Sequence, residues 1–118
     1  MQSYKDLVVW QKSIQLVSAI YRITEKFPKS EIFGLTSQMR RAAVSIPANL
    51  AEGYARKHRA EYVQFVRIAF GSGAELETFL VIAQNLKFVK KEEVVEAEKL
   101  LDEIMRMLNK LISGLGDN

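Results

Sequence analysis

The chain has 118 residues, the length of one ordinary domain, and it contains no cysteine. Its 48% hydrophobic and 26% charged residues are typical of a soluble globular protein. Without cysteine it cannot form disulfides, thiolate metal sites or a thiol nucleophile. The first residues lack the apolar run of a signal peptide, and no stretch is long and uncharged enough to span a membrane, so we expect a cytoplasmic protein.

The net charge of +3 is unevenly distributed along the chain. Residues 35–67 have a local balance of +4, whereas residues 89–118 have a local balance of −2. A basic middle segment can attract nucleic acid or acidic partners. The alternative interpretation is an ordinary solvated surface.

The first helix is expected at about residues 5–26, with Ser3 as its N-cap and Pro28 as its end signal. Apolar residues recur at steps of three and four, which predicts a core-facing seam of Leu7, Trp10, Ile14, Val17, Tyr21 and Thr24. A second stripe lies beside this seam and consists of Val9, Leu16, Ile20, Ile23 and Phe27. Two stripes indicate a helix with neighbours on two sides.

The second helix is expected at about residues 31–55, with a seam of Leu35, Met39, Ala42, Ile46 and Leu50. Pro47 lies inside this segment and cannot donate a hydrogen bond to the carbonyl of Ala43. Because the apolar period resumes at Leu50, the pattern predicts a kinked helix rather than a broken one.

The third and fourth helices are expected at about residues 59–87 and 91–113. The seam of the third is Tyr62, Phe65, Ala69, Ser72, Leu76, Phe79, Ala83 and Leu86. The small residues at positions 71–74 are expected to let a neighbouring helix come close. The seam of the fourth is Val94, Ala97, Leu101, Ile104, Leu108 and Leu111.

Four amphipathic helices joined by short connections predict an all-α fold, an antiparallel up-down-up-down four-helix bundle. One domain is expected to span residues 1–118.

Catalytic motifs are not evident in the sequence. His58 is the only histidine, so the paired Glu-x-x-His motifs of di-iron bundles and histidine zinc sites cannot be built. No glycine-rich phosphate loop occurs, because Gly71 and Gly73 lack the following lysine and lie in mid-helix. We therefore expect no enzyme activity, no metal and no cofactor, and interpret His58 as a loop or capping residue.

Polar residues fall at several positions between the second and third helices. If these helices pair about a turn near Lys57, residue i faces residue 114 − i, which places Ser45 near Ala69. In this register Arg40 or Arg41 is expected to pair with Glu75 and to fix how the two helices slide. The alternative role for these residues is a ligand or phosphate site.

The most basic short run is Arg56, Lys57, His58 and Arg59, which is expected at one end of the bundle. Together with Arg67 it forms the candidate nucleic-acid-binding surface.

Several motifs occur in a fixed order along the chain: DLVVWQK at 6–12, GLTSQMRRAA at 34–43, SIPANLAEG at 45–53 and AFGSGAELE at 69–77. This order resembles the bacterial four-helix bundle protein family first noticed in intervening sequences of 23S ribosomal RNA genes, a family whose cellular role is poorly defined. The resemblance implies a ring-shaped homopentamer. It also implies a distant similarity to the accessory variability determinant of diversity-generating retroelements, a basic pentamer that binds nucleic acid and a reverse transcriptase.

The family pattern singles out a set of polar residues in this chain. We assign to a structural polar network Gln38, Arg40, Arg41, Asn49, Glu52, Ser72 and Glu75. In a pentamer the apolar residues Phe70, Phe79 and Tyr62 are candidates for subunit contacts, and the alternative is that they belong to the core of one subunit.

Two functions follow as hypotheses. The first is a non-enzymatic oligomer that binds RNA or DNA through repeated basic patches. The alternative is a protein-interaction scaffold that presents its surface to another protein. The expected partners are thus further copies of the chain, nucleic acid or another protein, and not a membrane.

Overall fold

The computed structural model describes residues 3–116, which form four long helices and, within that range, no strand. The helices are α1 (Val8–Glu25), α2 (Leu35–Arg56), α3 (Arg59–Asn85) and α4 (Lys91–Gly116). Short 3-10 helices precede α1 at Tyr4–Asp6 and α2 at Lys29–Glu31. The predicted all-α class is confirmed, and each helix lies within a few residues of its expected range.

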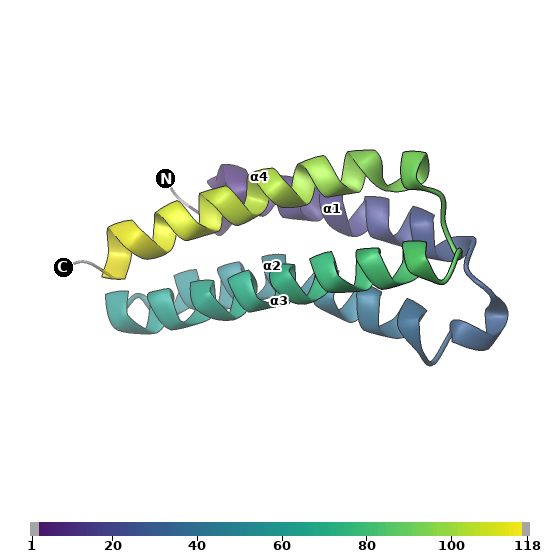
Figure 1. Ribbon diagram of the computed structural model, residues 1–118. Helices are drawn as coiled ribbons and strands as arrows, with labels where there is room; N and C mark the ends of the chain where they lie inside the picture. Colours follow the sequence, from purple (N-terminus) through teal and green to yellow (C-terminus); the bar gives the residue numbers. More distant parts are fainter. Residues whose placement is uncertain (1–2, 117–118) are drawn as a thin grey trace.

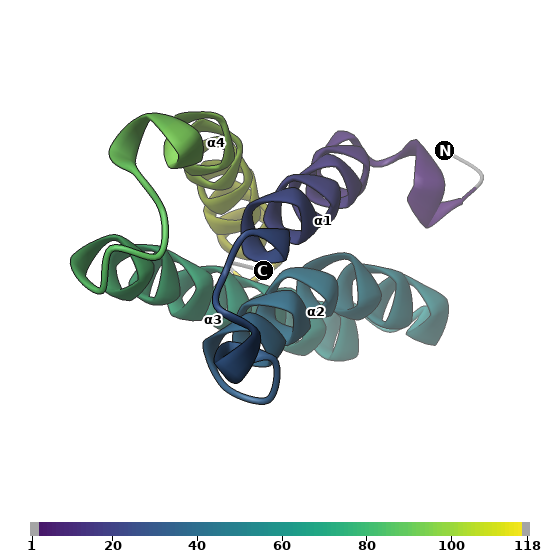
Figure 2. The ribbon, with the colours of Figure 1, turned by 90° about the vertical axis from the view of Figure 1, so that its right-hand side faces the viewer.

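The helices run antiparallel along a body of 45 × 23 × 21 Å (Figure 1). Each helix packs against two others, because α1 contacts α2 and α4, while α3 contacts the same two helices. The turn between α2 and α3 lies at the same end as both ends of the described chain, and the other two connections lie at the opposite end. Seen end-on, α1 and α2 form one side of the bundle, and α3 and α4 form the other (Figure 2).

The core confirms the predicted seams of α2 and α4 and corrects that of α1. In α1 the second stripe is the buried one, with Leu16 and Ile20 fully enclosed. Ile14 and Tyr21, which the seam places in the core, are 41% and 42% exposed. The two stripes are equally periodic, so only the positions of α2 and α4 decide which one turns inward.

The seam of α3 needs a similar correction at its end. Ala69, Leu76 and Ala83 are buried as predicted, but Leu86 is 55% exposed. Phe79, together with Phe70 and Tyr62, is partly buried against the core, which favours the single-subunit interpretation of these aromatic residues over a subunit contact.

Small residues set the distances between helices. A Cβ atom built on Gly53 of α2 would lie 2.7 Å from Cβ of Phe65 on α3. A Cβ atom on Gly73 of α3 would meet the flexible end of the Met105 side chain on α4, whereas Gly71 faces nothing within 4 Å. The expected role of the small run is therefore confirmed for Gly73 and wrong for Gly71.

Two local predictions about α1 and α2 have different outcomes. Pro47 is buried within α2, and the helix continues to Arg56, so the prediction that proline does not break it is confirmed. Ser3 does act as a cap, because its hydroxyl accepts a hydrogen bond from the backbone N–H of Lys5 at 3.1 Å. However, it caps the short Tyr4–Asp6 helix, and α1 itself begins at Val8.

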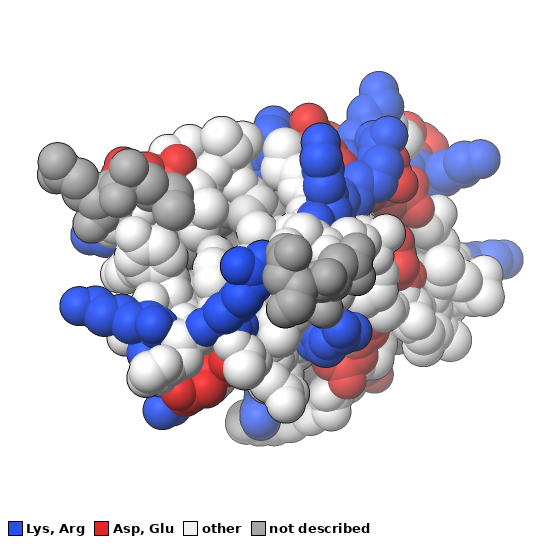
Figure 3. Space-filling view, turned by 90° about the vertical axis from the view of Figure 1, so that its left-hand side faces the viewer, with Lys and Arg blue, Asp and Glu red and all other residues white. Residues whose placement is uncertain are grey.

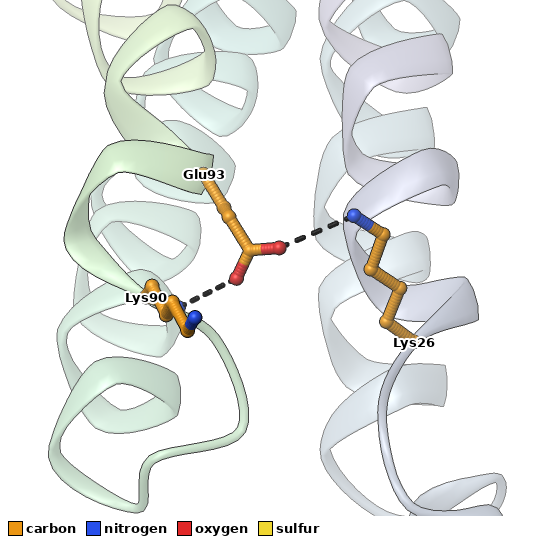
Figure 4. A network of polar contacts seen from close by, with 3 residues as sticks. All are labelled: Lys26, Lys90 and Glu93. Carbon is orange, nitrogen blue, oxygen red and sulfur yellow. Dashed lines mark hydrogen bonds and ion pairs between the residues drawn. The ribbon is translucent and has the colours of Figure 1, made fainter.

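The start of α4 is fixed by Glu93 rather than by a small polar cap. One carboxylate oxygen of Glu93 accepts a hydrogen bond from the backbone N–H of Lys90 at 2.8 Å, the glutamate half of a capping box (Figure 4). The other lies 3.2 Å from Nζ of Lys26, at the end of α1. The Lys90 hydrogen bond, followed by the Lys26 contact, lowers the pKa of Glu93 below its ordinary value. Glu93 thus connects the start of α4 to the end of α1.

The lowered pKa predicts a pH-dependent contribution to stability. A carboxylate whose pKa is lower in the folded state stabilises that state at pH above its ordinary pKa, and the contribution disappears as the pH falls through the lowered value. Glu93→Gln should therefore lower the unfolding midpoint at pH 7, and the difference from wild type should vanish in acid. Thermal melts across a pH series measure this, with Glu77→Gln in the middle of α3 as the control. A deficit that is equal at neutral and acid pH would show that the charge of Glu93 has no role.

The two glycine environments predict opposite effects of one substitution. Gly53→Ala should lower the free energy of unfolding by about 1–3 kcal/mol, because the new methyl group collides with Phe65. Gly71→Ala should raise it by up to about 1 kcal/mol, because the helix gains propensity without a collision. Denaturant unfolding of both variants measures the pair. Equal effects in the two variants would contradict the close approach at Gly53.

Candidate functional site

The predicted basic run lies at the turn between α2 and α3. Lys57 adopts a left-handed conformation (φ 62°) after the last residue of α2, and His58 is extended as the N-cap of α3. These two residues therefore reverse the chain within a very short connection. Basic side chains project from this end of the molecule, with acidic side chains among them (Figure 3). His58 thus lies in the connection, at the N-cap position of α3, as the loop interpretation predicts, but its side chain forms no capping hydrogen bond.

Both arginines of this run form contacts with other residues of the molecule. Arg56 lies 3.0 Å from Glu52 and 3.8 Å from Glu61, measured between side-chain nitrogen and oxygen atoms. Arg59 donates hydrogen bonds to the carbonyl oxygens of Gly114 and Leu115 at 2.8 and 2.9 Å. It thereby binds the C-terminal turn of α4, where carbonyl groups lack helical partners. Arg56 and Arg59 are thus occupied in structural contacts.

The remaining cations of the predicted surface are more available. Lys57 and His58 are exposed, as is Arg67. Among residues 3–116, Lys57 and Arg67 form no ion pair within 4.0 Å. Arg67 follows Arg59 by eight residues on α3, so it lies about 12 Å farther along the helix axis. The structure therefore separates Arg67 from the cluster at the turn.

The predicted ion pair between Arg40 and Glu75 is wrong. Nε of Arg40 donates a hydrogen bond to the hydroxyl of Thr24 at 2.9 Å, and its guanidinium lies 4.4 Å from the centre of the Tyr21 ring. Arg40 thus connects α2 to α1 rather than to α3. No feature of the sequence indicated Thr24 or Tyr21 as its partner.

Arg41 and Glu75 do approach the same place, since both line one pocket between α2 and α3. Within the described residues they form no ion pair at 4.0 Å or less, so the predicted pairing is wrong for Arg41 also. Glu75 and Arg41 are both exposed.

A chain of hydrogen bonds replaces the predicted ion pair between α2 and α3. The Ser72 hydroxyl donates to the Ser45 hydroxyl at 2.9 Å, and Nδ2 of Asn49 donates to the same oxygen at 2.8 Å. Ser45 therefore faces Ser72 instead of Ala69, which is a shift of about one helical turn from the predicted register. The assigned polar network thus divides into separate groups, with Glu52 bound to Arg56 and Gln38 at the rim of the pocket.

Sequence reasoning did not indicate a buried hydroxyl at the turn end of the bundle. The hydroxyl oxygen of Tyr62 is enclosed and has no hydrogen-bond partner among the described residues. Burial, with a smaller effect of Tyr54, raises the pKa of Tyr62. A raised pKa keeps this phenol neutral and gives it no role as a base at neutral pH.

Large apolar side chains are exposed on two sides of the bundle, a feature that the seam analysis assigned to the core or missed. On the α1–α2 side, Tyr21, Ile32 and Val44 line a shallow pocket of ≈ 490 Å³. On α3 the exposed apolar residues are Ile68 and, near the C-terminal end, Val81 and Ile82, followed by Leu86 at the C-cap. Phe33, in the connection between α1 and α2, is 94% exposed.

Neither a metal centre nor a membrane span is formed by the part of the chain that the structure describes. No three histidine, aspartate or glutamate side chains there are grouped so as to hold a metal ion. No helix between residues 3 and 116 is both long and apolar enough to cross a bilayer.

Comparison with known proteins gives a family match and a structural match. Residues 5–110 match the sequence profile described as 23S rRNA-intervening sequence protein. A crystal structure of a protein of unknown function from the S23 ribosomal protein family of Bacteroides thetaiotaomicron is similar, with a TM-score of 0.79 and 24% identity. The similarity covers 89% of this chain and 98% of that one, and at this identity it shows the fold alone. No match was found among curated proteins.

Proposed function

Because the chain belongs to the 23S rRNA-intervening sequence protein family, whose function is unknown, we propose its role from its surface: a non-enzymatic, self-associating helical scaffold. The observation that carries this proposal is that large apolar side chains are exposed both on the α1–α2 side of the bundle and on α3. Large apolar side chains grouped on the outside of a small charged protein mark contact surfaces.

The two surfaces differ, which favours one kind of assembly. The α1–α2 surface contains Tyr21 and Val44 beside Arg40, whereas the α3 surface contains Val81, Ile82 and Leu86. Contact between two different surfaces of identical chains is head-to-tail, and such contacts form closed rings when the rotation between subunits allows it. This supports a ring, and the family resemblance implies that it has five subunits.

Self-association predicts a mass that depends on these surfaces. The wild-type protein should sediment as a multiple of the 13.5 kDa chain, with five copies as the expected number. Val44→Glu and Ile82→Glu each bury a charge in the proposed contact, so each should shift the population to monomers that retain their helical content. Analytical ultracentrifugation and circular dichroism measure mass and folding separately.

Asn109→Glu is the matched control, because it adds the same charge at an exposed position of α4, a helix that carries neither of the two apolar surfaces. A monomeric wild-type protein at all accessible concentrations would refute self-association. Assembly unaffected by both apolar variants would place the contact elsewhere.

The carboxylates that could serve an enzyme support a non-enzymatic role. Glu52 is bound by Arg56 and is half exposed, and Glu75 is exposed at the pocket rim. Neither lies in the kind of enclosed environment in which catalytic carboxylic acids are usually found. We also propose that the protein is located in the cytoplasm.

Nucleic-acid binding is the second candidate function, and the unpaired cations favour it. Lys57 and Arg67 are exposed without acidic partners among the described residues, and the chain has a net charge of +3. A ring would repeat these cations once in each subunit and so raise the local positive potential. The proposed similarity to the accessory variability determinant, a protein that binds nucleic acid, is part of this second candidate function.

Phosphate binding by these cations predicts a steep dependence on salt. Binding of labelled single-stranded RNA and duplex DNA should weaken linearly on a log–log plot of affinity against salt concentration. Lys57→Glu and Arg67→Glu should each weaken binding and reduce the slope by about 1 for each phosphate that the variant no longer binds. Fluorescence anisotropy over a salt series gives both quantities.

Lys99→Glu on α4 is the control, since it makes the same charge change on another part of the surface. Arg59 variants are unsuitable here, because they would also release the end of α4. Absence of binding at low salt, or an equal decrease in affinity in all three variants, would refute the assigned nucleic-acid surface and leave the scaffold function intact.

A further inference from the structure

A polar pocket of ≈ 340 Å³ opens between α2 and α3, apart from the basic turn. Its lining consists of Gln38, Arg41, Ala42, Ser45, Ser72 and Glu75. Five of these six side chains are polar, and they come from both helices. The core beneath them holds the two walls at a fixed distance, because Ala42 and its neighbours Met39 and Ile46 are buried.

The pocket contains two opposite charges that do not neutralise each other. Arg41 and Glu75 line the same space, yet neither forms an ion pair within 4.0 Å with any residue that the structure describes. The adjacent Arg40, by contrast, is fixed against Thr24 and Tyr21. The space between Arg41 and Glu75 can therefore receive a molecule that carries the two complementary charges.

Hydroxyl groups complete the pocket between the charges. Oγ of Ser45 accepts two hydrogen bonds, from Asn49 and from Ser72, which leaves its own proton to donate. The Gln38 amide at the rim offers both a donor and an acceptor. Donors thus accompany Arg41 on the α2 side, and the acceptor Glu75 lies on α3.

We propose that this pocket binds a small zwitterion of the α-amino acid class. The ligand carboxylate contacts the Arg41 guanidinium and the Ser45 hydroxyl, and the ligand ammonium contacts Glu75. An arginine fork matches a carboxylate with two parallel hydrogen bonds. The polar pocket adjoins the apolar pocket of the α1–α2 surface, because Arg41 and Ser45 line both, whereas Gln38, Ser72 and Glu75 line only the polar one.

Charge selects the zwitterion over simpler ligands. A simple anion such as phosphate is attracted by Arg41 but repelled by Glu75, and a simple amine meets the opposite combination. Because both charges are exposed to solvent, each contact is weak by itself, and binding in the millimolar range is expected.

A matched set of three compounds tests the proposal. L-Alanine carries both charges, propionate is its counterpart without the ammonium group, and ethylamine is its counterpart without the carboxylate. Heteronuclear NMR titration of the full chain should show saturable shifts at the amides of Arg41, Ser45 and Ser72 with L-alanine. Propionate and ethylamine should bind at least about tenfold more weakly, since each lacks one charged hydrogen-bonding group.

Single substitutions test whether L-alanine binds in this pocket and whether its binding is independent of self-association. Arg41→Gln and Glu75→Gln should each reduce the affinity for L-alanine by about tenfold or more, while Glu77→Gln on the same helix should leave it unchanged. Sedimentation of the same variants should show unchanged mass.

Three results would overturn the zwitterion site. The first is no saturable shift at these amides with L-alanine up to about 50 mM. The second is equal binding of propionate or ethylamine. The third is a change of mass in Glu75→Gln, whose side chain lines only the polar pocket, because this would identify the pocket as a contact between subunits and would support the scaffold proposal instead.

Discussion

The close approach of α2 and α3 is the constraint on which the other features depend. Gly53 has no side chain where Phe65 passes, so the two helices meet near their shared turn without a gap. Farther along, Ala42 and Ala69 are buried, so small side chains continue to separate the helices there. Polar side chains also meet between these two helices, where the hydroxyl of Ser72 donates to that of Ser45. The polar pocket is therefore a direct consequence of tight helix packing.

Helix geometry also decides which cations have structural roles. Arg40 and Arg41 are sequential, so they point about 100° apart around α2, and the first reaches α1 while the second reaches the pocket. The same reasoning applies at the turn, where Arg59 folds back to the carbonyl groups of α4 and Lys57 extends into solvent. A basic run in the sequence is thus divided by the fold into residues that hold helices together and residues that are available to a partner.

The sequence was sufficient for the helices and for much of the core, and insufficient for the contacts between polar side chains. The spacing of apolar residues predicted the buried faces of α2 and α4 because each of these helices has a single strong apolar stripe. It failed for α1, where Ile14 and Leu16 belong to two equally periodic stripes and the choice depends on the neighbouring helices. The register between α2 and α3 was one turn off, because it depends on the short Lys57–His58 reversal and on the approach at Gly53. The one ion pair predicted across this interface, between Glu75 and Arg40 or Arg41, does not form among the described residues.

The double stripe of α1 connects the fold to its proposed assembly. The inner stripe completes the bundle, so the folded subunit does not need Ile14 and Tyr21 in its interior. Their apolar surface remains exposed on the α1 side, while Ile82 and Leu86 remain exposed on the α3 side. The angle between these two sides is set by the packing of α2 on α3, and in a head-to-tail ring that angle determines the rotation between subunits and hence their number. The small residues of the α2–α3 seam would then fix the geometry of the assembly as well as that of the subunit.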